Sequence, residues 1–386
     1  MKKICFVTGS RAEYGLLSGL MLLVQKDPDF ELQIIATNMH LSPEFGLTYR
    51  EIEGDGFVIN KKVEMLLSSD TSNGTTKSVG LATIGFADAY EDLKPDMLVI
   101  LGDRYEMLAA VTAALFYKIP VVHLYGGEIT EGAYDDSIRH AITKMSHLHF
   151  TATEAYRKRV IQMGEQPDRV FYVGAVGVEN ARKLKLMTKH ELEKSLGIAI
   201  KDKTLLITFH PVTLENSTAK EQCENLLNAL EQLPEYQFIF TMPNSDTEGR
   251  IIIQLINEFV ATHKENSFAI TSLGKLRYLS MLQYASAVVG NSSSGIVEVP
   301  SFGIPTVNIG NRQKGRISSA SVVHCDTSVE AIKQGLDKAL SVEIKSIASK
   351  KINPYQKNDT IENIISIIKG FQFDGIISKS FFDITV

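Results

Sequence analysis

Short apolar runs rich in β-branched residues alternate with amphipathic stretches along the first half of this 386-residue chain. The runs predict strands at residues 3–8, 32–37, 97–101, 121–124 and 170–173. The amphipathic stretches predict helices at residues 12–25, 77–93, 104–117, 137–145 and 155–163. Because this alternation is typical of a parallel sheet covered by helices on both faces, the first half is predicted to be a doubly wound α/β domain.

The second half repeats the pattern, and 386 residues suit two domains better than one core. Strands are predicted at 204–209, 237–242, 268–271, 287–289 and 306–309, and helices at 221–232, 247–262 and 275–284. We therefore predict an α/β protein of two Rossmann-like, doubly wound domains that face each other across a cleft.

The glycine-bearing run Phe171-Tyr172-Val173-Gly174-Ala175-Val176-Gly177 marks the predicted crossover between the domains. It gives an N-terminal domain at 1–174 and a C-terminal domain at 175–370. A further helix is expected at 361–369, and the apolar tail at 371–386 is expected to pack back on the N-terminal domain.

Bulk properties narrow the class of protein. The formal net charge of -5 argues against a general nucleic-acid binder, which is usually basic. We find no run of about 18 apolar residues and expect no membrane span, and residues 1–9 predict a buried strand rather than a signal peptide. Cys5, Cys223 and Cys325 are odd in number and widely spaced. Such cysteines suit the reducing cytoplasm and offer neither a disulfide framework nor a metal-binding motif.

Polar residues follow the predicted strands of the N-terminal domain, where doubly wound sheets bind ligands. Arg11 opens a helix, where its charge opposes the helix dipole, so it is either a solvated arginine or the mark of an anionic partner. Asp103, in the Gly102-Asp103-Arg104 motif that directly follows a strand, is either a helix N-cap or a cleft carboxylate. His147 and His149 lack further candidate ligands nearby, and we interpret them as structural rather than metal-binding.

The loop after the strand at 121–124 has the richest chemistry. Gly126 and Gly127 let the backbone come close to a ligand, and Glu128 follows them. Asp135 and Arg139 are four residues apart and share a helix face. An ordinary intrahelical ion pair explains Asp135 and Arg139 but not Glu128.

The strand ends of the C-terminal domain suit a nucleoside diphosphate. His210 can donate to a phosphate or move a proton near neutral pH, and Asn244, in Met242-Pro243-Asn244-Ser245-Asp246, ends the next strand. The stretch Asn291-Ser292-Ser293-Ser294-Gly295-Ile296-Val297-Glu298 predicts a strand end and a helix N-terminus, which is either an ordinary serine N-cap or a phosphate site with Glu298 on a ribose. Arg312 can pair bidentately with a diphosphate. This partition suggests nucleotide binding by one domain and acid/base chemistry by the other.

Several motifs follow one another along nearly the whole chain: Gly9-Ser10-Arg11-Ala12-Glu13-Tyr14, Gly102-Asp103-Arg104, Gly126-Gly127-Glu128, Asp135-Asp136-Ser137-Ile138-Arg139-His140, His210-Pro211-Val212-Thr213, Pro243-Asn244 and Gly290-Asn291-Ser292-Ser293. In order and spacing they resemble the hydrolysing UDP-N-acetylglucosamine 2-epimerases of sialic acid synthesis. The resemblance implies a glycosyltransferase-B type fold and the conversion of UDP-GlcNAc and water to N-acetylmannosamine and UDP through a 2-acetamidoglucal. It implies no NAD, no catalytic metal, and a homodimer or homotetramer.

The resemblance also implies roles for residues. Asp103, Glu128 and Asp135 would supply the proton transfers, and Arg139 would orient Asp135 or hold it ionised. His210 would stabilise or protonate the leaving diphosphate. The positions expected to line the UDP site are Arg11, Ala12, Arg104, Asn244, Leu273, Ser292, Ser293, Glu298 and Arg312.

The chain departs from some relatives at two positions, where it has Tyr125 instead of a glutamate and Leu16 instead of a lysine. A proton-transfer role at Tyr125 is therefore absent. One alternative keeps the reaction but acts on a UDP-2,4-diacetamido sugar or on GDP-GlcNAc, as in legionaminic acid synthesis. The others are a glycosyltransferase of the same fold and a non-catalytic nucleotide-sugar binding protein, which fold alone does not separate.

Overall fold

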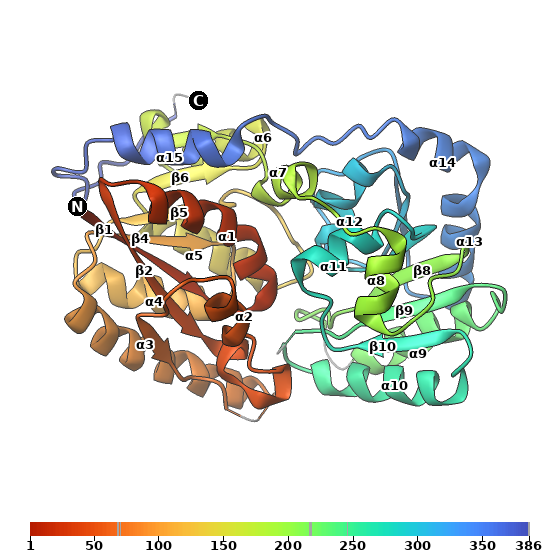
Figure 1. Cartoon of the computed structure of the whole chain (residues 1–386). Coiled ribbons are helices and arrows are strands. Elements are labelled where there is room, and N and C mark those ends of the chain that lie inside the picture. Colours follow the sequence, from red (N-terminus) through yellow and green to blue (C-terminus); the bar gives the residue numbers. More distant parts are fainter. Residues whose placement is uncertain (68, 70, 216–217, 245, 385–386) are drawn as a thin grey trace. The chain divides into compact units, whose positions relative to one another are not determined.

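The computed structural model describes residues 1–67, 69, 71–215, 218–244 and 246–384, and divides the chain into two compact units (Figure 1). Unit 1 comprises Met1–Glu128, Asp135–Asn180 and Tyr355–Val386, and unit 2 comprises Ile129–Tyr134 and Ala181–Pro354. Ser245, in one predicted strand-end motif, and residues 385–386 of the tail lie outside the described residues.

Within the described residues, unit 1 forms a seven-stranded sheet in the order β3-β2-β1-β4-β5-β6-β7, with parallel pairing throughout. Its strands are β1 (Lys2–Thr8), β2 (Phe30–Thr37), β3 (Lys61–Val63), β4 (Met97–Leu101), β5 (Val121–Leu124), β6 (Leu148–Thr151) and β7 (Val170–Tyr172). Its helices are α1 (Arg11–Lys26), α2 (Tyr49–Gly54), α3 (Ser72–Leu93), α4 (Tyr105–Phe116), α5 (Asp135–Met145), α6 (Glu154–Gln162), α15 (Thr360–Gly370) and the first part of α7 (Val176–Lys183).

Unit 2 forms a six-stranded sheet over its described residues, in the order β10-β9-β8-β11-β12-β13 and again with parallel pairing. Its strands are β8 (Thr204–Thr208), β9 (Gln237–Thr241), β10 (Ser267–Ile270), β11 (Ala287–Gly290), β12 (Thr306–Ile309) and β13 (Val322–Cys325). Its helices are α8 (Lys189–Leu196), α9 (Ala219–Leu230), α10 (Gly249–Thr262), α11 (Gly274–Met281), α12 (Ser294–Val297), α13 (Val329–Leu340) and α14 (Val342–Ser349).

The predicted fold class is confirmed, because both sheets are parallel and helices alternate with their strands. Successive residues of β1 face opposite layers: Ile4 and Phe6 belong to one buried cluster, and Cys5 and Val7 to another. The sequence analysis did not predict β3, β6 or β13, which are only three or four residues long and contain lysine or histidine. Among the described residues, the helices include none with the length and apolar character needed to cross a membrane.

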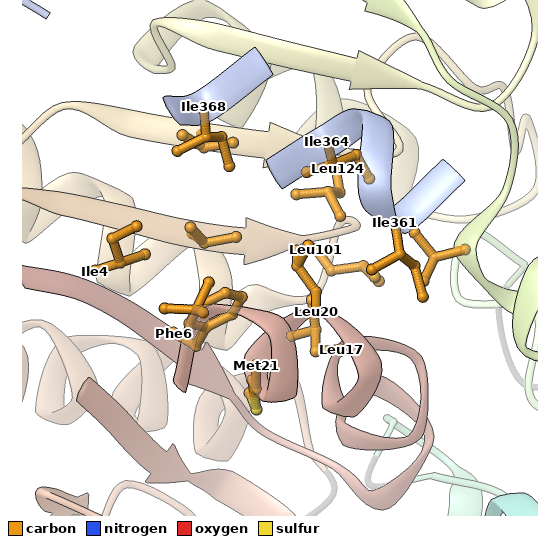
Figure 2. Close-up of a cluster of buried hydrophobic side chains, with 14 of the residues drawn as sticks. Ile4, Phe6, Leu17, Leu20, Met21, Leu101, Leu124, Ile361, Ile364 and Ile368 are labelled. Atoms are coloured by element: carbon orange, nitrogen blue, oxygen red, sulfur yellow. The ribbon is translucent and has the colours of Figure 1, made fainter. Parts of the chain in front are cut away.

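The compact units divide the chain elsewhere than the predicted boundaries at 174 and 370. Helix α15 belongs to unit 1, because Ile361, Ile364 and Ile368 enter the core lined by Leu17 and Leu20 of α1, as Figure 2 shows. The described part of the tail belongs to unit 1 as well. There the Lys379 ammonium donates to the carbonyl of Ser146 at 2.6 Å, and the Phe382 N–H donates to the carbonyl of Gly164 at 2.9 Å.

We predict that Ile364→Ala lowers the free energy of unfolding by about 2–5 kcal/mol, because it leaves a cavity between α15 and α1. The matched control is Ile84→Ala on α3, where the side chain is 65% exposed and the loss should stay within about 0.5 kcal/mol. Urea denaturation of both variants measures the difference. Equal losses would contradict the placement of α15 in the core.

Candidate functional site

Arg139 of α5 lies at the centre of the polar residues at the carboxyl ends of the unit 1 strands. Its side chain is 1% exposed, and its guanidinium pairs with the Asp103 carboxylate. It also pairs with Asp136 at 3.2 Å and donates to the backbone carbonyl of Glu128 at 2.8 Å. The guanidinium therefore joins the loop after β4, the loop after β5 and the start of α5. The expected partnership of Arg139 with Asp135 stays a prediction.

The carboxylates predicted to carry protons lie in this same region of unit 1. Glu128 and Asp135 are 3% and 6% exposed, and the Asp103 side chain is 20% exposed. Of the two roles considered for Asp103, the N-cap role is wrong, because Arg104 takes the N-cap position of α4. A carboxylate paired with a buried arginine is what the structure shows instead.

The paired glycines before Glu128 allow close packing of the backbone, and their approach to a ligand stays a prediction. Gly127 has a φ of 79°, and a Cβ on it would lie 2.5 Å from the carbonyl oxygen of Tyr156 in α6. A Cβ on Gly126 would lie 3.1 Å from the Thr143 hydroxyl. The backbone here comes close to α6 and α5, and glycine is needed for that contact.

His123 of β5 holds the turn that carries Asp103. Its Nε2 lies 2.8 Å from the carbonyl oxygen of Gly102, and its Nδ1 lies 3.2 Å from the Thr143 hydroxyl. Complete burial lowers the pKa of His123 to about 3, so the ring is neutral near pH 7. The sequence alone does not indicate this role, because it depends on the strand order that places β5 beside β4.

His147 and His149 have structural partners, as expected. The Nδ1 of His147 accepts the N–H of Val121 at 3.1 Å, and His149 lies 3.1 Å from the buried carboxylate of Glu165.

A second buried acidic group lies where the loops after β1 and β4 meet. Oε2 of Glu13 accepts the N–H groups of Gly9 at 2.7 Å and Ser10 at 3.2 Å, and the Glu13 N–H donates to the Ser10 hydroxyl at 3.4 Å, which completes a capping box on α1. The Glu106 carboxylate lies against Gly9, since a Cβ there would be 2.4 Å from its Oε1. Burial, followed by the charge of Glu106, raises the pKa of Glu13 to about 8, while the Gly9 N–H and Arg104 act in the opposite direction.

The predicted UDP-site residues of unit 1 lie on these same loops. Arg11 is half-buried and pairs with Glu51 of α2, so the anionic partner that the structure shows is a side chain of the protein. Arg104 is 8% exposed and lies 3.6 Å from Glu106, and Ala12 is exposed.

The buried amide of Asn291 joins three strand-end loops of unit 2. Its Oδ1 accepts the N–H of His210 at 2.7 Å, and its Nδ2 donates to the carbonyl of His210 at 2.8 Å. Its own carbonyl accepts from Arg312 at 3.2 Å and from Gln313 at 3.0 Å. Asn291 thereby ties the loop after β11 to the loops after β8 and β12. Asn291 belongs to the motif Gly290-Asn291-Ser292-Ser293, but the sequence alone does not indicate this role.

His210 also connects to the next predicted binding residue, because the N–H of Asn244 donates to its Nδ1 at 3.5 Å. The structure thus brings His210, Asn244 and Arg312 together within unit 2. The backbone carbonyl of Leu273, at the N-cap of α11, accepts from Arg277 at 2.8 Å.

The helix expected after the serine turn is shorter than predicted. Helix α12 has four residues and gives way to a 3-10 turn at Val299–Phe302, so the N-terminal dipole of a long helix is not present. Ser292 and Ser293 are half-buried, and Ser293 takes the N-cap position without a side-chain capping bond. Glu298 follows the last residue of α12. Gly290, with a φ of 132°, lets the end of β11 approach β8, because a Cβ there would lie 1.9 Å from the Thr208 carbonyl oxygen.

Glu179, Asp359 and Glu362 bring carboxylate oxygens within 4.8 Å of one another, a spacing that can hold a metal ion. Oε2 of Glu179 accepts the N–H of Ile361 at 2.6 Å in the first turn of α15. The geometry therefore accounts for Glu179 as a helix-capping carboxylate, and we assign no metal there.

Comparison with known proteins agrees with this architecture. Residues 23–369 match the family model described as UDP-N-acetylglucosamine 2-epimerase. The chain is 43% identical, over 99% of both chains, to a Campylobacter jejuni protein named GDP/UDP-N,N'-diacetylbacillosamine 2-epimerase (hydrolyzing). It is 38% identical to a Legionella pneumophila protein named UDP-N,N'-diacetylbacillosamine 2-epimerase (hydrolyzing), over 88% of this chain and 89% of the other.

A solved structure shares the fold at lower sequence identity. It is a Neisseria meningitidis UDP-GlcNAc 2-epimerase bound to UDP-GlcNAc, with a TM-score of 0.79 and 20% identity, over 95% of this chain and 99% of the other. The two parallel sheets and this structural match show a two-domain fold of the glycosyltransferase-B type. The family match makes the class specific: the chain belongs to the UDP-N-acetylglucosamine 2-epimerase family.

We predict that Glu13→Gln flattens the pH dependence of stability. Between the ordinary pKa of 4.5 and the raised pKa of about 8, the unfolded chain loses a proton that the folded chain keeps, so wild-type stability falls as pH rises through this window. The variant should gain on the order of 1–3 kcal/mol relative to wild type between pH 5 and pH 8. Urea denaturation at both pH values measures this, with exposed Glu64→Gln as control. Parallel profiles for the three proteins would contradict a buried, protonated Glu13.

Proposed function

We propose that this chain is a hydrolysing 2-epimerase of a nucleoside-diphosphate-linked 2-acetamido sugar. It would convert the UDP-sugar and water to the free C2-epimeric sugar and UDP. The observation that carries the proposal is the end-to-end match, at 43% identity, to a relative named as hydrolysing. The buried carboxylates around Arg139 support it, because the reaction needs several proton transfers.

The chemistry proceeds by elimination and then hydration. A carboxylate takes the C2 proton, the C1–O bond breaks, and UDP leaves with the bonding electrons to give the 2-acetamidoglucal. Water then adds its hydroxyl at C1, and a proton returns to C2 on the opposite face, which inverts that centre. We assign these proton transfers to Asp103, Glu128 and Asp135, of which Glu128 and Asp135 are buried and Asp103 is paired with Arg139. Arg139 holds the Asp103 carboxylate in place.

The loops that Asn291 joins would bind the nucleotide. Arg312 and the serine turn would hold the diphosphate, and His210 would donate to it as its charge develops. Glu298 is assigned to the ribose and the Leu273 backbone to the uracil. Ser292, Ser293 and Asn244 complete the binding residues proposed in unit 2, and Arg11, Ala12 and Arg104 are those proposed in unit 1.

The relatives change which sugar should be tested first. The sequence motifs favour UDP-GlcNAc over the 2,4-diacetamido sugars, but relatives at 43% and 38% identity are named for diacetylbacillosamine. We therefore propose UDP-N,N'-diacetylbacillosamine as the first substrate and UDP-GlcNAc as the second candidate, which the family description favours. Incubation with each in deuterated water, followed by proton NMR, tests both. Free UDP and a C2-deuterated epimer are expected from one of them, and neither product from either sugar would contradict the proposal.

Asp103→Asn and Glu128→Gln should each lower kcat by roughly 100-fold or more, because general acid/base groups contribute that much to proton transfer. The dissociation constant for UDP should change little, since the residues proposed to bind the diphosphate lie in unit 2. Turnover assays and calorimetric titration with UDP measure the two effects. Exposed Asp88→Asn on α3 is the control, and near-normal activity in both site variants would remove the acid/base assignment.

Arg312→Ala should weaken UDP binding by about 1–3 kcal/mol through the loss of a charge-assisted hydrogen bond. Calorimetric titration measures it directly, with exposed Lys333→Ala on α13 as a charge-matched control. An unchanged dissociation constant for UDP would exclude Arg312 from the site.

A further inference from the structure

Six residues, Ile129–Tyr134, belong to a different compact unit from their neighbours in sequence. Glu128 before them and Asp135 after them are part of unit 1, but the six residues themselves are part of unit 2. We call this stretch the 129–134 segment. The two residues that flank it are proposed proton-transfer groups, so its anchorage bears on where those groups are held.

Backbone hydrogen bonds anchor the segment to two loops of unit 2. The N–H of Glu131 donates to the carbonyl of Lys314 at 3.1 Å. The N–H of Leu214 donates to the carbonyl of Gly132 at 3.3 Å, and the N–H of Tyr134 donates to the Thr213 hydroxyl at 3.1 Å. The middle and the C-terminal end of the segment are therefore hydrogen-bonded to the loops after β8 and β12.

Glycine is required where the segment meets the loop after β12. A Cβ on Gly132 would lie 2.5 Å from the carbonyl oxygen of Asn311 and 3.1 Å from the Cα of Arg312. Both are backbone atoms, so a side chain at position 132 would force the segment away from the loop after β12. On the other side of the loop, a Cβ on Gly315 would lie 2.4 Å from a methyl group of Ile129. The contact is close along the length of the segment.

The two loops that anchor the segment are the ones proposed to bind the diphosphate. Thr213 lies three residues after His210, and Asn311 directly precedes Arg312. A ligand that orders these loops must also restrain the segment bonded to them, because hydrogen-bonded backbone transmits such restraint through direct contact. The restraint then reaches Glu128 and Asp135 through the chain itself.

We propose that the 129–134 segment is a positioning element that couples nucleotide binding in unit 2 to the placement of Glu128 and Asp135. The proposal rests on the proposed function for the role of those two carboxylates. Gly132 and Thr213 are positioning residues in this scheme, since they act through the segment and not on the substrate. Proton transfer is sensitive to such placement, because displacement by about 1 Å costs up to 100-fold in rate.

Hydrogen exchange with UDP as the probe tests the coupling without any turnover. Saturating UDP should slow hydrogen exchange of the Glu131 and Tyr134 amides in the wild-type protein. Both amides donate hydrogen bonds to the loops that are proposed to bind the diphosphate, so ordering of those loops should protect them. The effect should be lost in Gly132→Ala. Unchanged exchange of both amides in wild type on addition of UDP would overturn the proposal.

Steady-state kinetics provide the second readout. Gly132→Ala should lower kcat by roughly 10- to 100-fold per folded molecule, with a smaller change in the dissociation constant for UDP. The matched control is Gly80→Ala, at an exposed position of α3 where a Cβ meets nothing within 4 Å. A purely structural linker predicts a lower melting temperature with normal kcat in the folded fraction, and that result would overturn the proposal.

A milder pair of variants keeps the test decisive if Gly132→Ala does not fold. Thr213→Val keeps the side-chain shape but removes the acceptor for the Tyr134 N–H, and Thr213→Ser restores it. We expect a several-fold loss of kcat in the first and recovery in the second, whereas equal kcat in both would overturn the proposal. If wild type turns over neither sugar but UDP still protects the Glu131 and Tyr134 amides, the proposed function is wrong and the coupling is supported.

Discussion

The buried charge of Arg139 sets the arrangement of the unit 1 site. A guanidinium that is 1% exposed is costly to desolvate unless anions and carbonyls surround it, and removal of one partner leaves an uncompensated charge. Its partners come from three places: Asp103 after β4, the Glu128 carbonyl after β5, and Asp136 in α5. Three loops must therefore meet for unit 1 to fold. The contacts that compensate the buried arginine therefore also hold the Asp103 carboxylate and the backbone of Glu128 in place.

In unit 2 the strand-end loops are joined by the neutral side chain of Asn291 rather than by a buried ion pair. The amide of Asn291 exchanges two hydrogen bonds with the backbone of His210, and its carbonyl accepts from Arg312 and Gln313. An uncharged amide fixes these loops without placing a negative charge where a diphosphate is proposed to bind. A carboxylate at this position would add a negative charge near the proposed diphosphate site and would leave the His210 carbonyl without the donor that Asn291 provides. The difference between the two units therefore matches their proposed tasks, with proton carriers in one and an anion site in the other.

Periodicity in the sequence was enough to predict both parallel sheets, because buried strands such as β4 and β8 are continuous apolar runs. It failed for β3 and for α12, where three or four residues carry too little pattern, and it could not assign α15, since an apolar face does not identify its partner. Residue chemistry pointed to Asp103 and Arg139, but their pairing spans 36 positions and depends on strand order. The roles of His123 and Asn291 were missed for the same reason.

Tyr125, in the loop before Glu128, lies in the left-handed region of backbone conformation, with a φ of 69°. A non-glycine residue held there costs on the order of 1 kcal/mol, so its surroundings must fix it. The Tyr125 hydroxyl accepts the N–H of Gly177 at 3.1 Å, in the first turn of α7. The side chain at 125 is thus directed to the start of α7 and offers no carboxylate for proton transfer. The nearest acidic residue along this loop is Glu128, which is buried and whose backbone carbonyl accepts from Arg139, so the proposed proton transfer in this loop rests on Glu128.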